Sequence, residues 1–381
     1  MTIAPPPPND EQAARLEGLR QRIKRLDAAV LALVAERMSL ARDIGEAKRS
    51  AGLPLRDFAQ EKQVLSRADS IAAELGLAPD LARTVMQQLI DEACRVQEQH
   101  QVSGFRGEAE RVLIVGGLGQ MGQWFARFLS NQGHAVQVFD VRSGPSEYPV
   151  APSLAGGLAQ ASLVLVAVSL ERVGEVVREI AHLGFRGTLF DIASLKSHLA
   201  ADFAAARAMG AGVTSIHPMF GPGARVLSDK VICLCDCGDA TANARVEALF
   251  GETAATLVRL SLEEHDRLAA YLLGLSHLVN LLFARALAQS GRTVAELSAV
   301  GSTTFRAQMT TTESVLLEDP ELYYAIQALN PFSPEVFAGL RQALDDWTLW
   351  IGGRDRAAFS GAMVHARKWL EGNEGGDSPR G

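Results

Sequence analysis

The spacing of hydrophobic positions changes twice along the chain and divides it into three parts. Residues 11–101 place apolar side chains three or four positions apart, which is the period of amphipathic helices. Residues 111–260 alternate short β-type runs, among them RVLIVGG, AVQVFD and SLVLVAV, with helical segments, as in a doubly wound parallel sheet. Residues 261–372 are helical again. The pattern predicts a multidomain chain: an all-α helical module, an α/β doubly wound domain and a second all-α helical domain.

The segments outside these parts lose the periodicity. Residues 102–110 indicate a linker between the first two parts. The proline-rich start, 1–9, and the glycine-rich end, 373–381, predict disordered termini.

Composition and charge exclude several classes of function. The 381 residues carry a formal charge of −7 and are 48% hydrophobic, which is enough for several packed cores. Nucleic acid is not an expected partner, because binding it requires a concentrated basic face. The opening MTIAPPPPND resembles no signal peptide, and no membrane span is expected, so the predicted compartment is the cytoplasm.

The four cysteines do not predict a metal site. Cys233, Cys235 and Cys237 would share one face of a strand, which is too crowded for tetrahedral ligation, and no matching Cys/His pair accompanies them. Buried strand cysteines are the favoured interpretation, and no metal is expected.

A glycine-rich stretch predicts a dinucleotide site. In RVLIVGGLGQMGQWFARFL, Gly117, Gly119 and Gly122 fit G-x-G-x-x-G between a strand and a helix. Gly117 would allow the tight turn, Gly119 the approach of a pyrophosphate and Gly122 helix packing, with Gln120 and Met121 opening the helix that faces the phosphates. The second part is therefore a predicted Rossmann-type domain.

The next strand ends in an acid that favours NAD. Asp140 stands close to the spacing of the residue that accepts the ribose hydroxyls, and its charge would repel a 2′-phosphate. Because of Arg142, two positions further on, NADP stays open as the alternative cofactor. The alternative for Asp140 is an ordinary turn residue at a strand end.

Three polar clusters follow predicted strands, at the edge where doubly wound sheets bind ligands. They comprise Ser169, then Asp191, Ser194 and Lys196 in DIASLKSHL, and His217 in SIHPMFGP. Ser194 could serve as a helix cap, and Lys196 could be a solvated helix residue.

His217 is the candidate general base. Pro218 restricts it to extended geometry, and Gly221 and Pro222 would turn the loop back toward the cofactor. A neutral imidazole beside a nicotinamide can take the proton of a substrate hydroxyl while hydride leaves the same carbon. The alternative is a turn histidine with its hydrogen bonds satisfied.

The helical module carries a charged position on an apolar seam. The seam reads Ile23, Leu26, Val30, Leu33, Arg37, Leu40, Ile44 and Ala47. Burying Arg37 requires an anion, and Lys48 lies three helical turns away on nearly the same side. The pair could hold a small dianion, whereas the alternatives are an internal ion pair or a snorkelling arginine.

From about residue 110 to 372 the chain resembles prephenate dehydrogenases. The matching stretches are VGGLGQMG, DIASLK, IHPMFGP, EEHDR, LLGLSHLVN, STTFRAQ and EDPELY. The resemblance implies NAD-dependent oxidative decarboxylation of prephenate to 4-hydroxyphenylpyruvate, on the route to tyrosine. His217 would then take the proton of the ring 4-hydroxyl, and Ser194 would hold that hydroxyl and the imidazole.

The same resemblance assigns substrate-binding residues to the second helical domain. Arg306 would meet a carboxylate of prephenate, for which a bidentate arginine is chemically suited, and His277 would also hold the substrate. The alternatives are an Arg306 paired on the helix surface with Glu313 and a His277 that is a core histidine. Asn280 stands where some members carry a second histidine.

Residues 11–101 resemble the all-helical chorismate mutases. The motif runs through LRQRIKRLD, ALVAERMSLARDIGEAK, GLPLRD, QEKQVL and MQQLIDEACRVQ, and it places Arg20, Arg37, Lys48, Asp57, Glu61 and Gln97 at the family's site positions. The resemblance implies that Arg37 and Lys48 hold folded chorismate and that Gln97 bonds its ether oxygen. Arg20 would reach into the partner's site, which implies a helix-exchanged dimer.

Two departures from the mutase motif leave a rival interpretation open. Gln60 replaces a usual arginine and Ala93 replaces a serine of some members, so weakened chorismate binding is expected. The main prediction is a bifunctional cytoplasmic homodimer that takes chorismate and prephenate as substrates, with tyrosine as a candidate feedback inhibitor. In the rival interpretation the module only regulates or dimerises the dehydrogenase, and a further alternative is a preference for arogenate.

Overall fold

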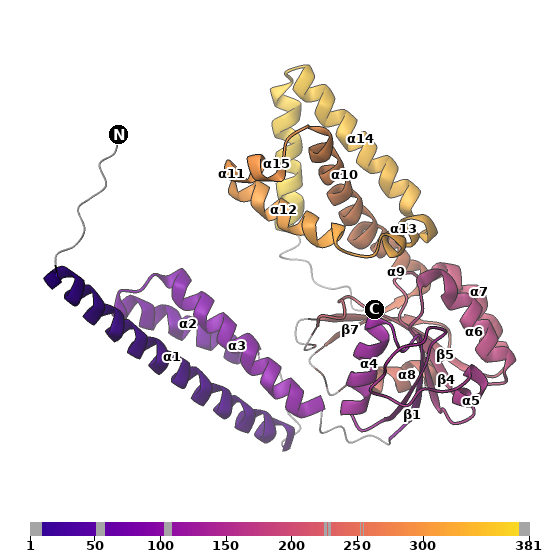
Figure 1. Ribbon diagram of the computed structural model, residues 1–381. Coiled ribbons are helices and arrows are strands. Elements are labelled where there is room, and N and C mark those ends of the chain that lie inside the picture. Colours follow the sequence, from indigo (N-terminus) through magenta and orange to yellow (C-terminus); the bar gives the residue numbers. More distant parts are fainter. Residues whose placement is uncertain are drawn as a thin grey trace. The chain divides into compact units, whose positions relative to one another are not determined.

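The computed structural model describes residues 10–50, 58–102, 109–224, 227, 230–251, 253 and 255–372. Figure 1 shows the elements. The chain forms two compact units, and the second contains the segments 169–174 and 193–202 together with the helices after residue 260. Two short segments that follow strands of the sheet therefore belong to the C-terminal helical unit. The sequence-based domain boundaries remain a prediction.

The N-terminal module consists of three helices. They are α1 (Asp10–Ser50), α2 (Phe58–Leu75) and α3 (Pro79–Val102), and α3 packs against both others (Figure 1). The buried residues at these contacts are mostly small, and they are Ala41, Ala68, Ala72, Ile90 and Cys94. α1 is about 60 Å long, so one neighbour covers only part of its surface.

The predicted seam of α1 lies largely outside this packing. Ile23, Leu26, Val30 and Leu33 are each more than half exposed. Uncovered apolar surface on this scale is typical of a protein interface.

The central domain is built on a seven-stranded sheet in the order β2-β1-β3-β4-β5-β6-β7. The strands are β1 (Arg111–Val115), β2 (Ala135–Phe139), β3 (Leu163–Val166), β4 (Thr188–Asp191), β5 (Gly212–Pro218), β6 (Val231–Asp236) and β7 (Thr256–Ser261). The five strands from β2 to β5 pair in parallel, as predicted.

The pairing of β6 departs from the expected parallel sheet. β6 runs antiparallel to β5, with His217 opposite Cys233. Parallel neighbours require a crossover helix, and the segment 219–230 contains none among its described residues. The sheet is therefore mixed.

Short helices accompany the strands of this sheet. They are α4 (Gln120–Asn131), α5 (Leu154–Leu158), η1 (Leu170–Arg172), α6 (Val173–His182), η2 (Ser197–Leu199), α7 (Ala200–Ala208) and α8 (Ala240–Ala248). Aromatic rings of α4 pack with Phe250 in the core, where Trp124 stacks on Phe128 and Phe128 stacks on Phe250. This packing fixes α4 against the sheet, and with α4 the glycine turn that precedes it.

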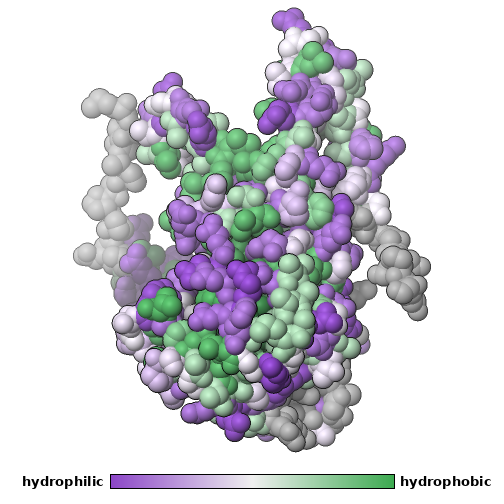
Figure 2. Space-filling model, turned by 90° about the vertical axis from the view of Figure 1, so that its right-hand side faces the viewer, coloured by the Kyte–Doolittle hydropathy of each residue, from purple (hydrophilic) through white to green (hydrophobic). Residues whose placement is uncertain are grey.

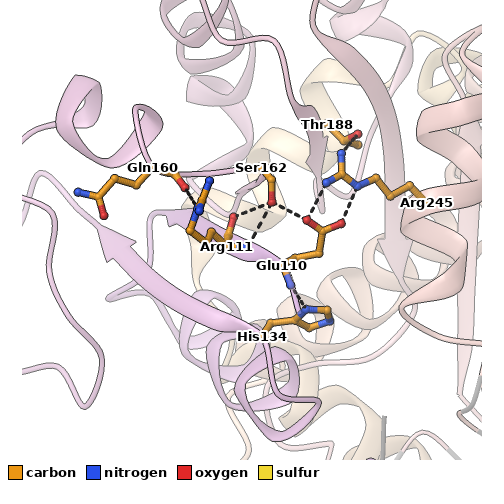
Figure 3. Close-up of polar contacts among 7 residues, drawn as sticks. All are labelled: Glu110, Arg111, His134, Gln160, Ser162, Thr188 and Arg245. Atoms are coloured by element: carbon orange, nitrogen blue, oxygen red, sulfur yellow. Dashed lines mark hydrogen bonds and ion pairs between the residues drawn. The ribbon is translucent and has the colours of Figure 1, made fainter. Parts of the chain in front are cut away.

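A polar network joins elements at the amino ends of the strands (Figure 3). Glu110 accepts two hydrogen bonds from Arg245 of α8, at 2.8 and 2.7 Å, and one from Ser162. Arg245 also donates to Thr188, and the backbone N–H of Glu110 donates to His134. These side chains cover the edge of the sheet where the strands begin. They also join the segment just before β1 to α8.

The C-terminal unit is helical. Its main elements are α9 (Leu262–Ala269), a π-helical turn η3 (Ala270–Leu275), α10 (Ser276–Gln289), α11 (Val294–Ala299), α12 (Thr303–Leu316), α13 (Pro320–Leu329), α14 (Ser333–Gly352) and α15 (Arg356–Gly372). Asn280 joins α10 to α12, since its Oδ1 accepts hydrogen bonds from Gln308 and Thr312.

The run Leu262–Gln289 is long and apolar enough, by length and composition, to cross a membrane. One such helix is weak evidence, because helices of soluble proteins pass the same test. Figure 2 shows hydrophobic residues gathered in places on one face of the surface. On this run they include Leu268, Tyr271, Leu272 and Leu282.

Candidate active sites

The glycine turn after β1 has the shape of a phosphate cradle. The N–H groups of Gly116 and Gly117 donate to the Phe139 carbonyl, and that of Gly119 donates to the Gly116 carbonyl at 3.0 Å. α4 then begins at Gln120 with Gly119 as its N-cap and no side-chain cap. The first N–H groups of a helix have no intrahelical partner, so this end suits a pyrophosphate.

The turn corrects the predicted role of Gly117. The backbone conformation that requires glycine is at Gly116, where φ is +86°, and not at Gly117. A Cβ at Gly117 would lie 2.5 Å from the Cβ of Val138, and one at Gly122 would collide with the Gly116 carbonyl. Gly117 therefore permits close packing on β2, and the positive φ of the turn is at Gly116. The Gly-Gly dipeptide at 116–117 could have indicated this.

Asp140 is tied to this turn. Its carboxylate accepts a hydrogen bond from the backbone N–H of Leu118 at 3.0 Å and is paired bidentately with the guanidinium of Arg142 at 3.1 Å. Burial would raise the pKa of Asp140, but the bonds from Arg142 and Leu118 lower it overall, so the group is ionised. Asp140 is more than a strand-end turn residue, because it connects β2 to the glycine turn.

Ser169 lies three residues after β3 and precedes η1, where its carbonyl accepts from the N–H of Arg172 at 2.9 Å. Its side chain makes no capping bond and the residue is exposed. The hydroxyl is therefore accessible at the end of its strand.

Ser194 is not a helix cap and Lys196 is not a solvated helix residue, which were the structural alternatives for these two positions. The helices that follow begin at Ser197 and Ala200, so Ser194, which is partly exposed, does not cap either. Lys196 is fully buried and is no solvated helix residue. The backbone N–H of Lys196 donates to both carboxylate oxygens of Asp266, at 2.9 and 3.2 Å.

His217 is the penultimate residue of β5. Its side chain is 6% exposed, and Pro218 is still paired in the strand, opposite Ile232. The chain turns just beyond, where the N–H of Ala224 donates to the Gly221 carbonyl. The strand therefore holds the imidazole at the carboxyl end of β5, which is the edge predicted for chemistry.

His277 and Arg306 lie in the C-terminal unit with defined partners. The ring of His277 stacks on Tyr323 of α13, with centroids 4.2 Å apart, and burial lowers its pKa. Arg306 is not paired with Glu313. Its guanidinium donates to the carbonyls of Gly301 and Ser298 at the end of α11.

In the helical module, the side chain of Arg37 on α1 contacts α3. Its guanidinium donates to the carbonyl of Leu89 at 2.5 Å, and burial lowers its pKa. A backbone carbonyl, and not a carboxylate, is thus the acceptor that meets it on α3. Lys48 is half-buried on the same helix.

The other predicted mutase positions are less fully described. Arg20 is exposed on α1, 3.9 Å from Glu17. Glu61 lies on α2 and Gln97 on α3, but their side chains are outside the described residues, as is Asp57 altogether.

Comparison with known proteins identifies both halves of the chain. Residues 19–98 match the family model for chorismate mutase type II, and residues 146–258 match that for the nucleotide-binding domain of prephenate dehydrogenase. A chorismate mutase of Methanocaldococcus jannaschii is 31% identical over 86 residues, which cover 23% of this chain and 87% of that protein.

The full-length match decides how the two halves belong together. The T-protein of Enterobacter agglomerans is 27% identical over 357 residues, covering 94% of this chain and 93% of that protein. The chain belongs to the bifunctional chorismate mutase–prephenate dehydrogenase family. The expected nucleotide-binding domain and the mutase module are both confirmed.

A solved structure shows the fold of the second half. A prephenate dehydrogenase from A. aeolicus, in complex with hydroxyphenyl propionate and NAD+, superposes with a TM-score of 0.57 at 18% identity. The match covers 70% of this chain and 99% of that one. The succession of a Rossmann-type sheet and C-terminal helices is therefore a known dehydrogenase fold.

Proposed function

We propose that this chain rearranges chorismate to prephenate in its N-terminal module. The second half then oxidises prephenate with NAD and releases carbon dioxide and 4-hydroxyphenylpyruvate. The observation that carries the oxidative step is the uncapped glycine turn at α4, tied to the acid at the end of β2 by the bond between Leu118 and Asp140. This arrangement is suited to a dinucleotide with an unphosphorylated ribose.

The nicotinamide cofactor, when bound, accepts the hydride from the substrate ring. The residues Gly117, Gly119, Gln120, Met121 and Gly122 would hold its pyrophosphate, with Asp140 at the ribose and Ser169 at the end of β3. A side chain at Gly119 would approach the Gly116 carbonyl to 3.2 Å, so the turn disfavours a larger residue at this position.

The proton chemistry belongs to His217. Its neutral imidazole takes the proton of the ring 4-hydroxyl, and Ser194 holds the hydroxyl and the imidazole in register. Loss of carbon dioxide makes the ring aromatic and draws the reaction forward.

The substrate carboxylate is held by Arg306. A guanidinium has five N–H donors, and two of those of Arg306 are bonded to the carbonyls of Gly301 and Ser298. These bonds fix the plane of the group and leave donors for a carboxylate. His277, held by its stacking on Tyr323, is the second substrate contact.

In the mutase module, no protein nucleophile is required. Arg37 and Lys48 hold the two carboxylates and the developing negative charge of chorismate, and Gln97 bonds the ether oxygen. Asp57 and Glu61 complete the site. Gln60, in place of an arginine, lowers affinity for chorismate and leaves these groups unchanged.

The active assembly is a homodimer. Support comes from the row of exposed apolar residues on α1, which includes Ile23, Leu26, Val30 and Leu33. A partner helix covering this row would bury it, and Arg20 would then reach the partner's site. The compartment is the cytoplasm, and tyrosine, the end product of the route, is the proposed feedback inhibitor.

The direct test supplies the full chain with chorismate and NAD. We expect one NADH for each chorismate consumed, with 4-hydroxyphenylpyruvate as product. Oxidation of added prephenate without consumption of chorismate would favour a module that only regulates or dimerises the dehydrogenase. Faster oxidation of arogenate, or with NADP, would overturn the substrate or cofactor assignment.

A further inference from the structure

A buried carboxylate joins two motifs that lie 70 residues apart. Asp266, in the EEHDR stretch at the start of α9, is fully buried. It accepts the backbone N–H of Lys196 at 2.9 and 3.2 Å and that of Ser197 at 2.7 Å. Nδ1 of the His265 imidazole lies 2.8 Å from Oδ1 of Asp266, the oxygen that also accepts the shorter bond from Lys196. All four residues belong to the C-terminal unit.

The surroundings hold this carboxylate and the loop together. The hydroxyl of Ser197 donates to the Leu262 carbonyl at 3.3 Å, and Asn330 donates to the backbone carbonyl of Asp266 at 2.8 Å. Burial would raise the pKa of Asp266, but bonds from His265, Ser197 and Lys196 lower it overall. An ionised buried carboxylate with several donors is a strong and directional anchor.

The anchored backbone lies next to the catalytic serine. Ser194 is two residues before Lys196 and three before Ser197, so the two N–H groups held by Asp266 fix the chain just after it. The Lys196 side chain is itself buried, so moving this loop would also expose or unpair a charged group.

We propose that Asp266 is a positioning residue for Ser194 in the oxidation of prephenate. The inference rests on the proposed dehydrogenase function. Asp266 touches no reacting atom. It holds the loop that carries Ser194 in one conformation, and a displacement of about 1 Å in a group that acts on the substrate can lower the rate about 100-fold.

The test is a double-mutant cycle in the full-length chain. Asp266→Asn keeps one carbonyl oxygen but cannot accept all three donors, so we expect kcat for prephenate oxidation to fall roughly 10- to 100-fold. The Kd for NAD, measured by fluorescence, and the turnover of chorismate should stay unchanged. With Ser194→Ala already present, Asp266→Asn should cost less than about 3-fold, because the group that it positions is gone.

Asp239→Asn is the matched control. Asp239 also holds two backbone N–H groups, those of Val213 and Ala242, but at the start of α8. It should lower thermal stability without lowering kcat. An equal loss of kcat from Asp266→Asn with and without Ser194, or a loss no larger than that from Asp239→Asn, would overturn the proposal, as would a Ser194→Ala variant of normal kcat. Failure of the proposed function itself would appear separately, as wild-type chain that does not oxidise prephenate.

Discussion

The carboxylate of Asp140, at the end of β2, accepts a hydrogen bond from the backbone N–H of Leu118 in the middle of the glycine turn. The same carboxylate is paired with Arg142, whose guanidinium is largely exposed. One acid thus shapes the glycine turn and is the residue proposed to bind the ribose.

Asp140→Ala should therefore impair NAD binding in two ways. The turn loses its anchor and the ribose loses its acceptor, so we expect KM for NAD to rise about 10-fold or more. The released Arg142 should improve binding of NADP relative to NAD. Steady-state kinetics with both cofactors check this, with Asp236→Asn as control, because Asp236 also ends a strand and accepts from Gly238 and Asn243. An unchanged KM for NAD in Asp140→Ala would contradict the assignment.

The strand–turn–helix pattern was sufficient to predict this site, whereas the position of the turn residue was not. G-x-G-x-x-G spacing does not say which glycine takes a positive φ, and that depends on how the turn meets β2 and Ala167. Likewise, nothing local in EEHDR indicates that Asp266 binds the backbone after Ser194, because the contact spans 70 residues.

Other differences have the same physical origin in tertiary contacts. Lysine is usually a solvated residue on a helix, but Lys196 is buried. The sequence of β6 predicts another parallel strand, but β6 pairs antiparallel to β5. The helical period of hydrophobic residues identifies the apolar seam of α1. It does not show whether another part of this chain or a second chain packs on that seam. In the single chain Ile23 and Leu26 remain exposed.

Arg37→Ala should separate the two activities. Removing the cation proposed to hold chorismate should lower kcat/KM of the mutase by about 100-fold or more, since such groups supply several kcal/mol to the transition state. Oxidation of prephenate should be unchanged. Arg42→Ala, on the exposed surface of α1, is the control and should retain both activities. Mutase activity retained in Arg37→Ala would disprove the role of Arg37.

Arg245 should matter for stability more than an exposed arginine does. Arg245→Ala leaves the half-buried Glu110 without its two hydrogen bonds from a guanidinium, so we expect the free energy of unfolding to fall by about 1–3 kcal/mol. Arg259→Ala removes a pair with Glu247 from a side chain that is 71% exposed and should cost less than about 1 kcal/mol. Denaturant unfolding of both variants gives the comparison, and equal losses would contradict the role of the network.

The pH dependence of stability should reveal His277. Burial lowers its pKa from 6.5, so between that value and the lowered one the unfolded chain binds a proton that the folded chain does not. The free energy of unfolding should then decrease as pH falls below about 6.5, by at most about 1.4 kcal/mol per pH unit. His277→Asn should flatten this slope, and His365→Asn, on the exposed surface of α15, should not. Identical slopes in both variants would show that His277 is not the group responsible.

We propose that one chain carries out both reactions in sequence, with His217 as the base of the second. The most direct measurement gives chorismate and NAD to the full-length His217→Asn variant and follows chorismate, prephenate and NADH together. We expect that chorismate disappears at the wild-type rate, that prephenate accumulates, and that NADH formation falls by at least about 100-fold while NAD still binds. NADH formation near the wild-type rate, or chorismate that is not consumed, would contradict it.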